Sequence, residues 1–171
     1  VARAALEGAR AGEPRLEEVY VAFARLSLLE GRVEDAVAAC TQGIELDKGY
    51  VPHYLERGEL RILIGLRAES SGGDPREGFQ QAHEDFAKAA ELDPGSPAPW
   101  MWLGNVLMRL GQWLREHGED PDPVFRRAEE ALAKAVEAGA QDSDAWLKQG
   151  ALYANWAVAL AAGGKDPDGA F

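Results

Sequence analysis

The stretch GEDPDPVF, from Gly118 to Phe125, has two close counterparts elsewhere in this chain of 171 residues. GGDPREGF begins at Gly72 and GKDPDGAF begins at Gly164, so the starts lie 46 residues apart, from Gly72 to Gly118 and from Gly118 to Gly164. An Asp side chain accepts hydrogen bonds from the free N–H groups at a helix start, and Pro suits the first helical position, where its missing N–H costs nothing. Each stretch therefore predicts the end of a loop and the start of a helix.

A shift of 46 residues also aligns much of the remaining sequence, which indicates an internal repeat. Each unit carries apolar residues at three- and four-residue steps in two segments, the pattern of two amphipathic helices. The Asp-Pro element lies between these segments, so each unit is predicted to form an antiparallel helix pair. The main aligned positions are Tyr54, Trp100 and Trp146; Gly58, Gly104 and Gly150; Ala82 and Ala128; Phe86 and Leu132; and Ala89 and Ala135.

The composition is that of a folded globular protein, with 46% hydrophobic and 27% charged residues. The net charge of −11 disfavours nucleic acid, where basic residues supply most of the affinity, and it also disfavours anionic membranes. No apolar run approaches the ~18 residues that cross a bilayer. The single cysteine, Cys40, excludes an internal disulfide and suits a reducing compartment. We therefore expect a cytoplasmic module, whose parent protein could still be membrane-anchored, with a neutral or basic partner.

The order and spacing of aromatic, small and apolar residues resemble the tetratricopeptide repeat (TPR), a helix–turn–helix unit of about 34 residues. In the first full unit, EEVYVAFARLSLLEGRVEDAVAACTQGIELDK (17–48), the motif positions are Tyr20, Phe23, Ala24, Gly31, Ala36, Cys40, Gly43 and Ile44. The resemblance implies an all-α fold, an α-solenoid of stacked antiparallel helix–turn–helix repeats that forms a TPR-like right-handed superhelix. It also implies a non-catalytic module for protein–protein interaction.

The TPR-like pattern covers residues 1–171 as a single domain. We divide it into a half repeat (1–14), a repeat (17–50), two long repeats (51–96 and 97–142) and a second half repeat (143–171). Helices are expected at about 1–11, 15–29, 32–46, 50–69, 75–92, 97–116, 121–138 and 143–161. The long repeats have 46 residues instead of about 34, which predicts about three extra turns shared by their two helices. Because both ends cut through a repeat, we expect a fragment of a longer protein, and the long repeats resemble arrays attached to bacterial signalling proteins.

Three residues depart from the TPR pattern, since Arg57, Arg61 and Gln149 stand where the family prefers apolar side chains. Leu107 and Tyr153, at the equivalents of Arg61 in the later repeats, comply with the pattern. The sequence leaves the packing around the departing residues open.

No constellation of residues predicts catalysis, and we expect no metal and no cofactor. The histidines, His53, His83 and His117, are far apart in sequence, and HEDF (83–86) lacks the second histidine of a zinc-binding helix. Cys40 stands at a bulky position of a second helix, so we expect a buried thiol rather than a nucleophile. The sequence has no Gly-rich phosphate loop, and the glycines before Asp-Pro resemble helix C-caps.

The five tryptophans divide into two groups. Trp100 and Trp146 occupy the aromatic packing position of the repeat, so they are expected in the core. The positions of Trp102, Trp113 and Trp156 are less determined, and any of them that is exposed could anchor a peptide.

Stacked helix pairs curl into a superhelix whose concave face is lined by the first helices of the pairs. The TPR resemblance implies that this groove binds a peptide or helix of a partner protein. The inward-facing positions are Val21, Arg25, Leu28, Leu55, Glu59, Ile62, Met101, Asn105, Met108, Leu147 and Ala151. Their mainly apolar mixture suits an amphipathic or apolar segment, although any one of them could instead pack against a neighbouring helix. The alternative function is structural, with self-association through the uncapped repeat ends into a homodimer or a filament-like stack.

Overall fold

The computed structural model describes Gly8, residues 17–139 and residues 143–164, without the side chains of 143–147 and 149. These described residues form seven α-helices and no β-strand, which confirms the predicted all-α class. The helices are α2 (Glu17–Leu29), α3 (Val33–Leu46), α4 (Val51–Ser70), α5 (Arg76–Leu92), α6 (Pro97–Glu116), α7 (Asp122–Glu137) and α8 (Ser143–Ala162). Each helix agrees with its predicted range to within two residues. The helix predicted at 1–11 lies outside the described residues, apart from Gly8.

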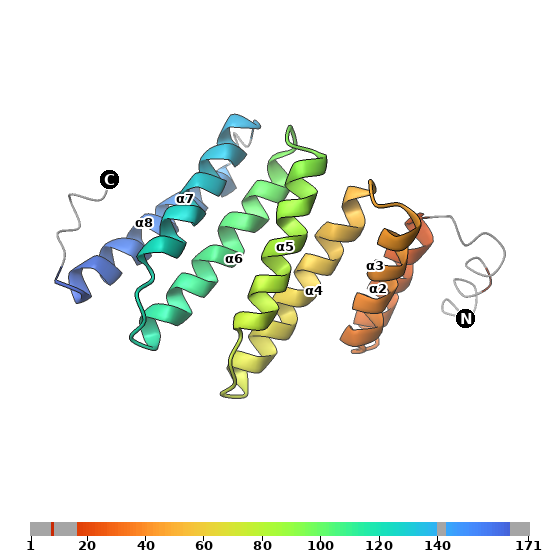
Figure 1. Cartoon of the computed structure of the whole chain (residues 1–171), viewed down its shortest axis with the longest axis horizontal. Coiled ribbons are helices and arrows are strands. Elements are labelled where there is room, and N and C mark those ends of the chain that lie inside the picture. The colour runs from red at the N-terminus through yellow and green to blue at the C-terminus, as the bar shows by residue number, and fades with distance from the viewer. Residues whose placement is uncertain (1–7, 9–16, 140–142, 165–171) are drawn as a thin grey trace. The chain divides into compact units, whose positions relative to one another are not determined.

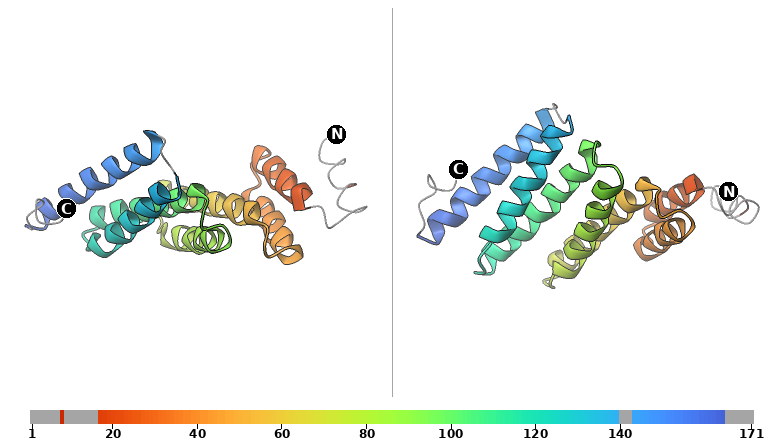
Figure 2. Two further views of the ribbon diagram at one scale, coloured as in Figure 1. Left: turned by 90° about the horizontal axis from the view of Figure 1, so that it is seen from above. Right: turned by 45° about the horizontal axis from the view of Figure 1, so that its top comes forward.

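The chain forms two compact units, Val1–Leu92 and Asp93–Phe171. In the first unit, α2 pairs with α3 and α4 pairs with α5, while α3 also packs against α4. In the second unit, α6 pairs with α7, and α8 packs against both α7 and α6. Figure 1 shows the antiparallel course of α4 with α5 and of α6 with α7, and Figure 2 shows the same pairs from two further directions. The boundary between the units falls at the start of the loop that joins α5 to α6.

The two long repeats form taller helix pairs than the first repeat. Helices α4 and α6 have 20 residues each, against 13 residues in α2. In each tall pair, two glycines of the first helix lie directly under a large side chain of the second. The contacts are Gly58 with Phe86 and Gly65 with Phe79 in the first unit, and Gly104 with Leu132 and Gly111 with Phe125 in the second. A Cβ atom added at any of these glycines would lie 2.4–2.8 Å from the facing side chain. The close packing at Gly58 and Gly104 is therefore repeated two turns later, at Gly65 and Gly111.

The turns that join the two helices of each tall pair follow the same hydrogen-bonding scheme. Gly72 (φ 77°) and Gly118 (φ 75°) adopt the left-handed conformation that glycine tolerates at a helix end. The next N–H group in each turn donates to a carbonyl five residues earlier. Asp74 Oδ1 then accepts the N–H of Arg76 at 2.9 Å, and Asp120 Oδ1 accepts the N–H two residues later at 3.1 Å. The Asp-Pro element thus precedes the second helix of both tall pairs. The prediction of Asp at the N-cap and Pro at the first helical position is wrong by one residue, because α5 begins at Arg76 and α7 at Asp122, one residue after each Pro.

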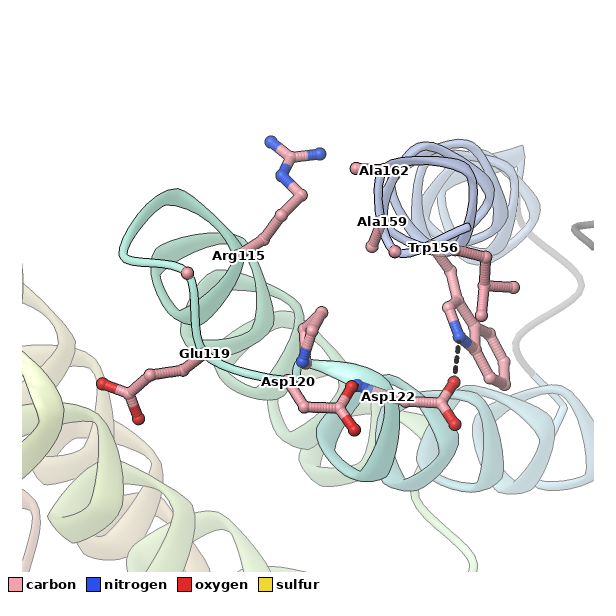
Figure 3. Close-up of a pocket in the computed structure, with 11 residues that line it drawn as sticks. Arg115, Glu119, Asp120, Asp122, Trp156, Ala159 and Ala162 are labelled. Atoms are coloured by element: carbon pink, nitrogen blue, oxygen red, sulfur yellow. Dashed lines mark hydrogen bonds between the residues drawn. The ribbon is translucent and has the colours of Figure 1, made fainter. Parts of the chain in front are cut away.

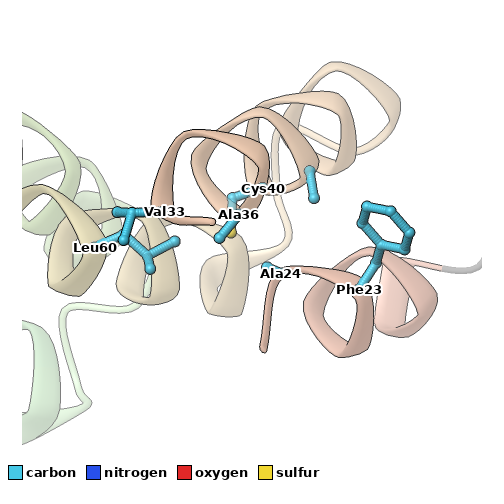
Figure 4. Packing of buried hydrophobic residues seen from close by; sticks show 7 residues of the cluster. Phe23, Ala24, Val33, Ala36, Cys40 and Leu60 are labelled. Atoms are coloured by element: carbon cyan, nitrogen blue, oxygen red, sulfur yellow. The ribbon is translucent and has the colours of Figure 1, made fainter. Parts of the chain in front are cut away.

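One hydrophobic cluster of the first unit lies where α2, α3 and α4 meet, and Figure 4 shows it from close by. Its buried side chains are Phe23, Ala24, Val33, Ala36, Ala39, Cys40 and Leu60. Cys40 is completely buried, and desolvation raises the pKa of its thiol to about 12. The thiol is therefore protonated at neutral pH and contributes packing rather than nucleophilic reactivity.

Candidate functional site

The structure divides the predicted groove residues into buried and accessible ones. Val21 (9% exposed), Ile62 (6%) and Met108 (9%) are buried, so these three pack in the interior. The side chain of Leu147 lies outside the described residues. The accessible residues are Arg25, Leu28, Leu55 and Glu59 in the first unit, and Met101, Asn105 and Ala151 in the second.

In the first unit, the accessible residues form a surface that we call the α2–α4 face: Arg25 and Leu28 on α2, and Leu55 and Glu59 on α4. The two residues on each helix are three or four positions apart, which places them on one side of that helix. The two helices are in contact. Leu28 exposes 37% of its surface, and the Arg25 side chain exposes 66%. The α2–α4 face therefore combines apolar and charged side chains on neighbouring helices.

An ion pair joins the two helices of this face. Arg25 donates from Nε to Glu56 Oε1 at 2.7 Å, and its Nη2 contacts the same oxygen. An ion pair this exposed contributes at most about 1 kcal/mol, so its main effect is to position the guanidinium between α2 and α4. Partial desolvation and the neighbouring Glu56 raise the pKa of Glu59, and Arg25 offsets this only in part. Arg25 thus lies near two carboxylates, those of Glu56 and Glu59, so these three side chains together carry a net negative charge.

The two arginines that depart from the TPR pattern share one buried carboxylate. Asp85 on α5 is 2% exposed and accepts hydrogen bonds from Arg57 Nη2 at 2.7 Å and from Arg61 Nη1 at 2.6 Å. Arg57 also donates to Thr41 Oγ1 at 3.0 Å, so the network connects α3, α4 and α5. Buried charges persist in folded proteins when they are paired in this way. The sequence pointed to the arginines but not to Asp85, although two arginines four residues apart were a sign that an acidic partner should face them.

In the second unit, Met101 and Asn105 are partly exposed on α6, and Ala151 is exposed on α8. Met101 and Trp100 pack against Ala135 of α7. Lys134 Nζ also lies 4.6 Å from the centre of the Trp100 ring, a cation–π contact. This surface is less charged than the α2–α4 face.

Two of the tryptophans that the sequence left undetermined are core residues. Trp156 is completely buried and Trp113 is 6% exposed, so neither can anchor a peptide. Trp102 is partly buried, and the Trp146 side chain lies outside the described residues. The indole of Trp156 donates to Asp122 Oδ1 at 2.6 Å and fastens α8 to the start of α7.

A cavity of about 360 Å³ lies between the α6–α7 turn and the C-terminal half of α8 (Figure 3). Ala159 and Ala162 line its α8 side, and their small side chains leave the space open. Figure 3 shows Arg115 extending toward α8 at one edge, with Glu119 pointing away from the cavity. This volume is at the lower end of the range for small-molecule sites, and it could accommodate a side chain of a bound segment.

The three histidines lie in different surroundings. His53 is completely buried, and its ring meets the ring of Tyr50 edge-on, with 4.9 Å between the ring centres. The ring of His117, at the end of α6, stacks on the ring of Trp113 with 4.0 Å between the ring centres. His83 lies on α5. Among the described residues, no group of three or more His, Cys, Asp or Glu side chains is arranged to hold a metal ion. None of the helices within this part of the chain is long and apolar enough to span a membrane.

No protein-family model matches the chain, and no curated protein matches it. Several solved structures do match the chain. MamA matches with a TM-score of 0.64 at 18% identity, over 99% of this chain and 75% of MamA. The first TPR domain of Spaghetti (RPAP3), bound to an HSP90 peptide, gives 0.62 at 13% identity, over 82% of this chain and 93% of that one. The Yersinia enterocolitica type III secretion chaperone SycD, in complex with a peptide of the translocator YopD, gives 0.55 at 17% identity, over 83% and 90%. At these identities the likeness establishes the fold alone.

Proposed function

We propose that this chain, which has the tetratricopeptide-type fold predicted from its sequence, is a non-catalytic scaffold that binds a peptide or helix of a partner protein. The observation that carries the proposal is the α2–α4 face, where the exposed Leu28 and the partly exposed Leu55 lie near the charges of Arg25, Glu56 and Glu59. Two of the similar structures support it, since the Spaghetti domain holds an HSP90 peptide and SycD holds a YopD peptide.

The α2–α4 face suits a segment that presents apolar side chains and at least one basic residue. Leu28 supplies apolar surface that is accessible to a partner, and Leu55 adds the part of its surface that is not packed against the cluster of Ile44, Tyr54 and Ala89. Partial burial and Glu56 both disfavour the ionised form of Glu59, and the attraction of a Lys or Arg brought beside it would favour that form. The net charge of −11 also favours a basic partner at long range.

A peptide library displayed on phage and selected on the wild-type chain would test this proposal. We expect the selected peptides to combine apolar residues with Lys or Arg. Their dissociation constants, measured by fluorescence anisotropy, should rise about tenfold or more for Glu59→Lys, because the basic residue then meets a like charge. Glu84→Lys is the matched control, since it makes the same charge change at an exposed mid-helix position on α5, and it should alter binding less than about twofold.

Equal binding to both charge variants would show that the α2–α4 face is not the site. Met101→Asp then tests the surface on α6, and peptides that lose affinity only for this variant would move the site to the second unit. Peptides unaffected by every one of these changes would contradict a site on either set of first helices.

The finer features of the module stay predictions. A bacterial parent protein and a cytoplasmic location rest on the TPR resemblance and on Cys40 alone. Self-association through the repeat ends is the alternative to peptide binding, and light scattering over a range of concentrations separates the two, because assembly must grow with concentration.

A further inference from the structure

His53 is a buried titratable side chain in the first turn of α4, where the first long repeat begins. Neither of its ring nitrogens, Nδ1 and Nε2, has a hydrogen-bond partner in the part of the chain that the structure describes. Most buried polar side chains do have such a partner, because an unpaired polar group is unfavourable in the interior. The closed fold therefore holds an imidazole whose polar atoms it leaves unpaired.

The ring of His53 is enclosed by the packing of α3 against the start of α4, which we call the α3–α4 junction. A Cβ atom added at Gly43 of α3 would lie 2.3 Å from Cε1 and from Nε2 of His53 and 2.7 Å from Cδ2, so only a glycine leaves room for the ring. The ring of Tyr50, just before α4, meets the imidazole edge-on. Because the side chain is completely buried, its ring reaches water only when the junction opens.

The surroundings of His53 decide its charge. Burial has the largest effect and lowers the pKa of the imidazole below its ordinary value. Arg57 of α4 adds to this effect. Three acidic groups from different elements oppose it, namely Glu17 of α2, Asp47 at the end of α3 and Glu56 of α4. Because burial prevails over these acids, the enclosed ring is uncharged at neutral pH.

A charged ring is incompatible with the closed junction. The imidazolium would be a buried charge with no acceptor for either of its N–H groups. Proton uptake is therefore favourable only after the ring has moved into water, and this movement separates α3 from the start of α4. Leu55 and Glu56 follow His53 on α4, and Glu56 pairs with Arg25 across the α2–α4 face. An open junction thus displaces the part of α4 that forms this face.

We propose that uptake of a proton by His53 opens the α3–α4 junction, and that this opening weakens ligand binding at the α2–α4 face. The junction is then a pH-sensitive device between two repeats, closed around the neutral ring and open when the charged ring lies in water. The second half of the proposal rests on the peptide-binding function proposed above. The first half concerns the junction alone and is tested without a ligand.

Hydrogen exchange of the 171-residue chain at about pH 7 and about pH 5 tests the opening. Exchange rates are converted to protection factors, which removes the intrinsic pH dependence of exchange. Protection in α3 and the first half of α4 should fall about tenfold at the lower pH, because the ring in the open state has an ordinary pKa of about 6.5. One such proton limits the fall to about 25-fold. Amides of α6 and α7, in the other unit, should change less than about threefold.

Two substitutions test whether His53 causes the opening. His53→Leu removes the titrating group, so the fall in α3 and α4 should shrink to less than about threefold. Gly43→Ala expels the ring without acid, so α3 and the start of α4 should already lose protection at about pH 7. Gly150→Ala is the matched control for the added methyl group, because a Cβ atom there meets nothing within 4 Å, and it should leave this protection unchanged.

Three results would overturn the opening: unchanged protection at the lower pH, an equal fall in the wild type and His53→Leu, or full protection in Gly43→Ala. An equal fall in α6 and α7 would indicate global unfolding and would overturn it as well. For the second half, the dissociation constant of a peptide bound at the α2–α4 face should rise about tenfold more on acidification for the wild type than for His53→Leu. An equal rise would refute the coupling, whereas a failure to find any such peptide would refute the proposed function and leave the exchange result standing.

Discussion

Replacing Gly78 with alanine should force α4 and α5 apart, because the added methyl group would collide with backbone. A Cβ atom at Gly78 would lie 2.7 Å from Gly65 N, 2.8 Å from Gly65 Cα and 2.9 Å from the carbonyl oxygen of Arg61. All three are main-chain atoms of α4, so no side-chain rotation can relieve the contact. One helix must therefore move by about half an ångström or more before the atoms reach normal packing distance.

The expected cost follows from two opposing contributions. Overpacking a close helix contact costs about 1–3 kcal/mol, and the better helix propensity of alanine returns up to about 1 kcal/mol. We expect Gly78→Ala to lower the free energy of unfolding by about 1–2 kcal/mol. Gly150→Ala is the matched control, since this glycine lies within a helix and faces open space, so the substitution should stabilise the chain by about 0.5–1 kcal/mol.

Urea unfolding followed by circular dichroism at 222 nm measures both variants against the wild type. The two substitutions make the same chemical change, so an opposite sign isolates the effect of the neighbouring backbone. If Gly78→Ala were as stabilising as Gly150→Ala, the close approach of α4 and α5 at Gly65 would be wrong.

Three further predictions concern buried polar groups. Asp85→Ala should cost about 2–4 kcal/mol in urea unfolding, because it leaves the guanidinium groups of Arg57 and Arg61 without their carboxylate, and a loss below about 1 kcal/mol would contradict the network. Burial lowers the pKa of His53 below 6.5, so the unfolded chain takes up this proton first and stability should fall as the pH drops below about 6.5. His53→Leu should flatten the stability profile between about pH 7 and pH 5, and an unchanged profile would show that His53 does not carry the effect. Trp156→Phe removes the indole hydrogen bond to the start of α7 and should cost about 1–2 kcal/mol, whereas unchanged stability would exclude this bond as a contribution.

The helix boundaries were predictable because the forces that set them are local. A left-handed glycine such as Gly72 ends a helix, and an aspartate such as Asp74 satisfies N–H groups only a few residues away. The apolar periodicity of each helix is likewise contained in its own residues. The extra length of the long repeats could be assigned to both helices because the Asp-Pro element keeps its position within each repeat.

The side-chain contacts between helices were less predictable, because they depend on how two helices meet. The unusual arginines at Arg57 and Arg61 were visible in the sequence, but their shared partner was not. Asp85 is one of several acidic residues in and around α5, and only the packing of α4 on α5 brings it to both guanidinium groups. The burial of Ile62 and Met108 depends in the same way on neighbours that a helical register does not specify.

The three glycines at the repeated position show where prediction from the repeat reaches its limit. Gly58, Gly104 and Gly150 are identical in sequence and share one register, yet the first two lie under a large side chain and the third faces open space. At Gly58 and Gly104 the covering residue, Phe86 or Leu132, belongs to the following helix and not to the helix that carries the glycine. The exposure of a residue in such an array is therefore decided by the helices beside it as well as by its own register. For this reason the binding residues must be found among accessible side chains such as Leu28 and Glu59, rather than by copying one repeat onto the next.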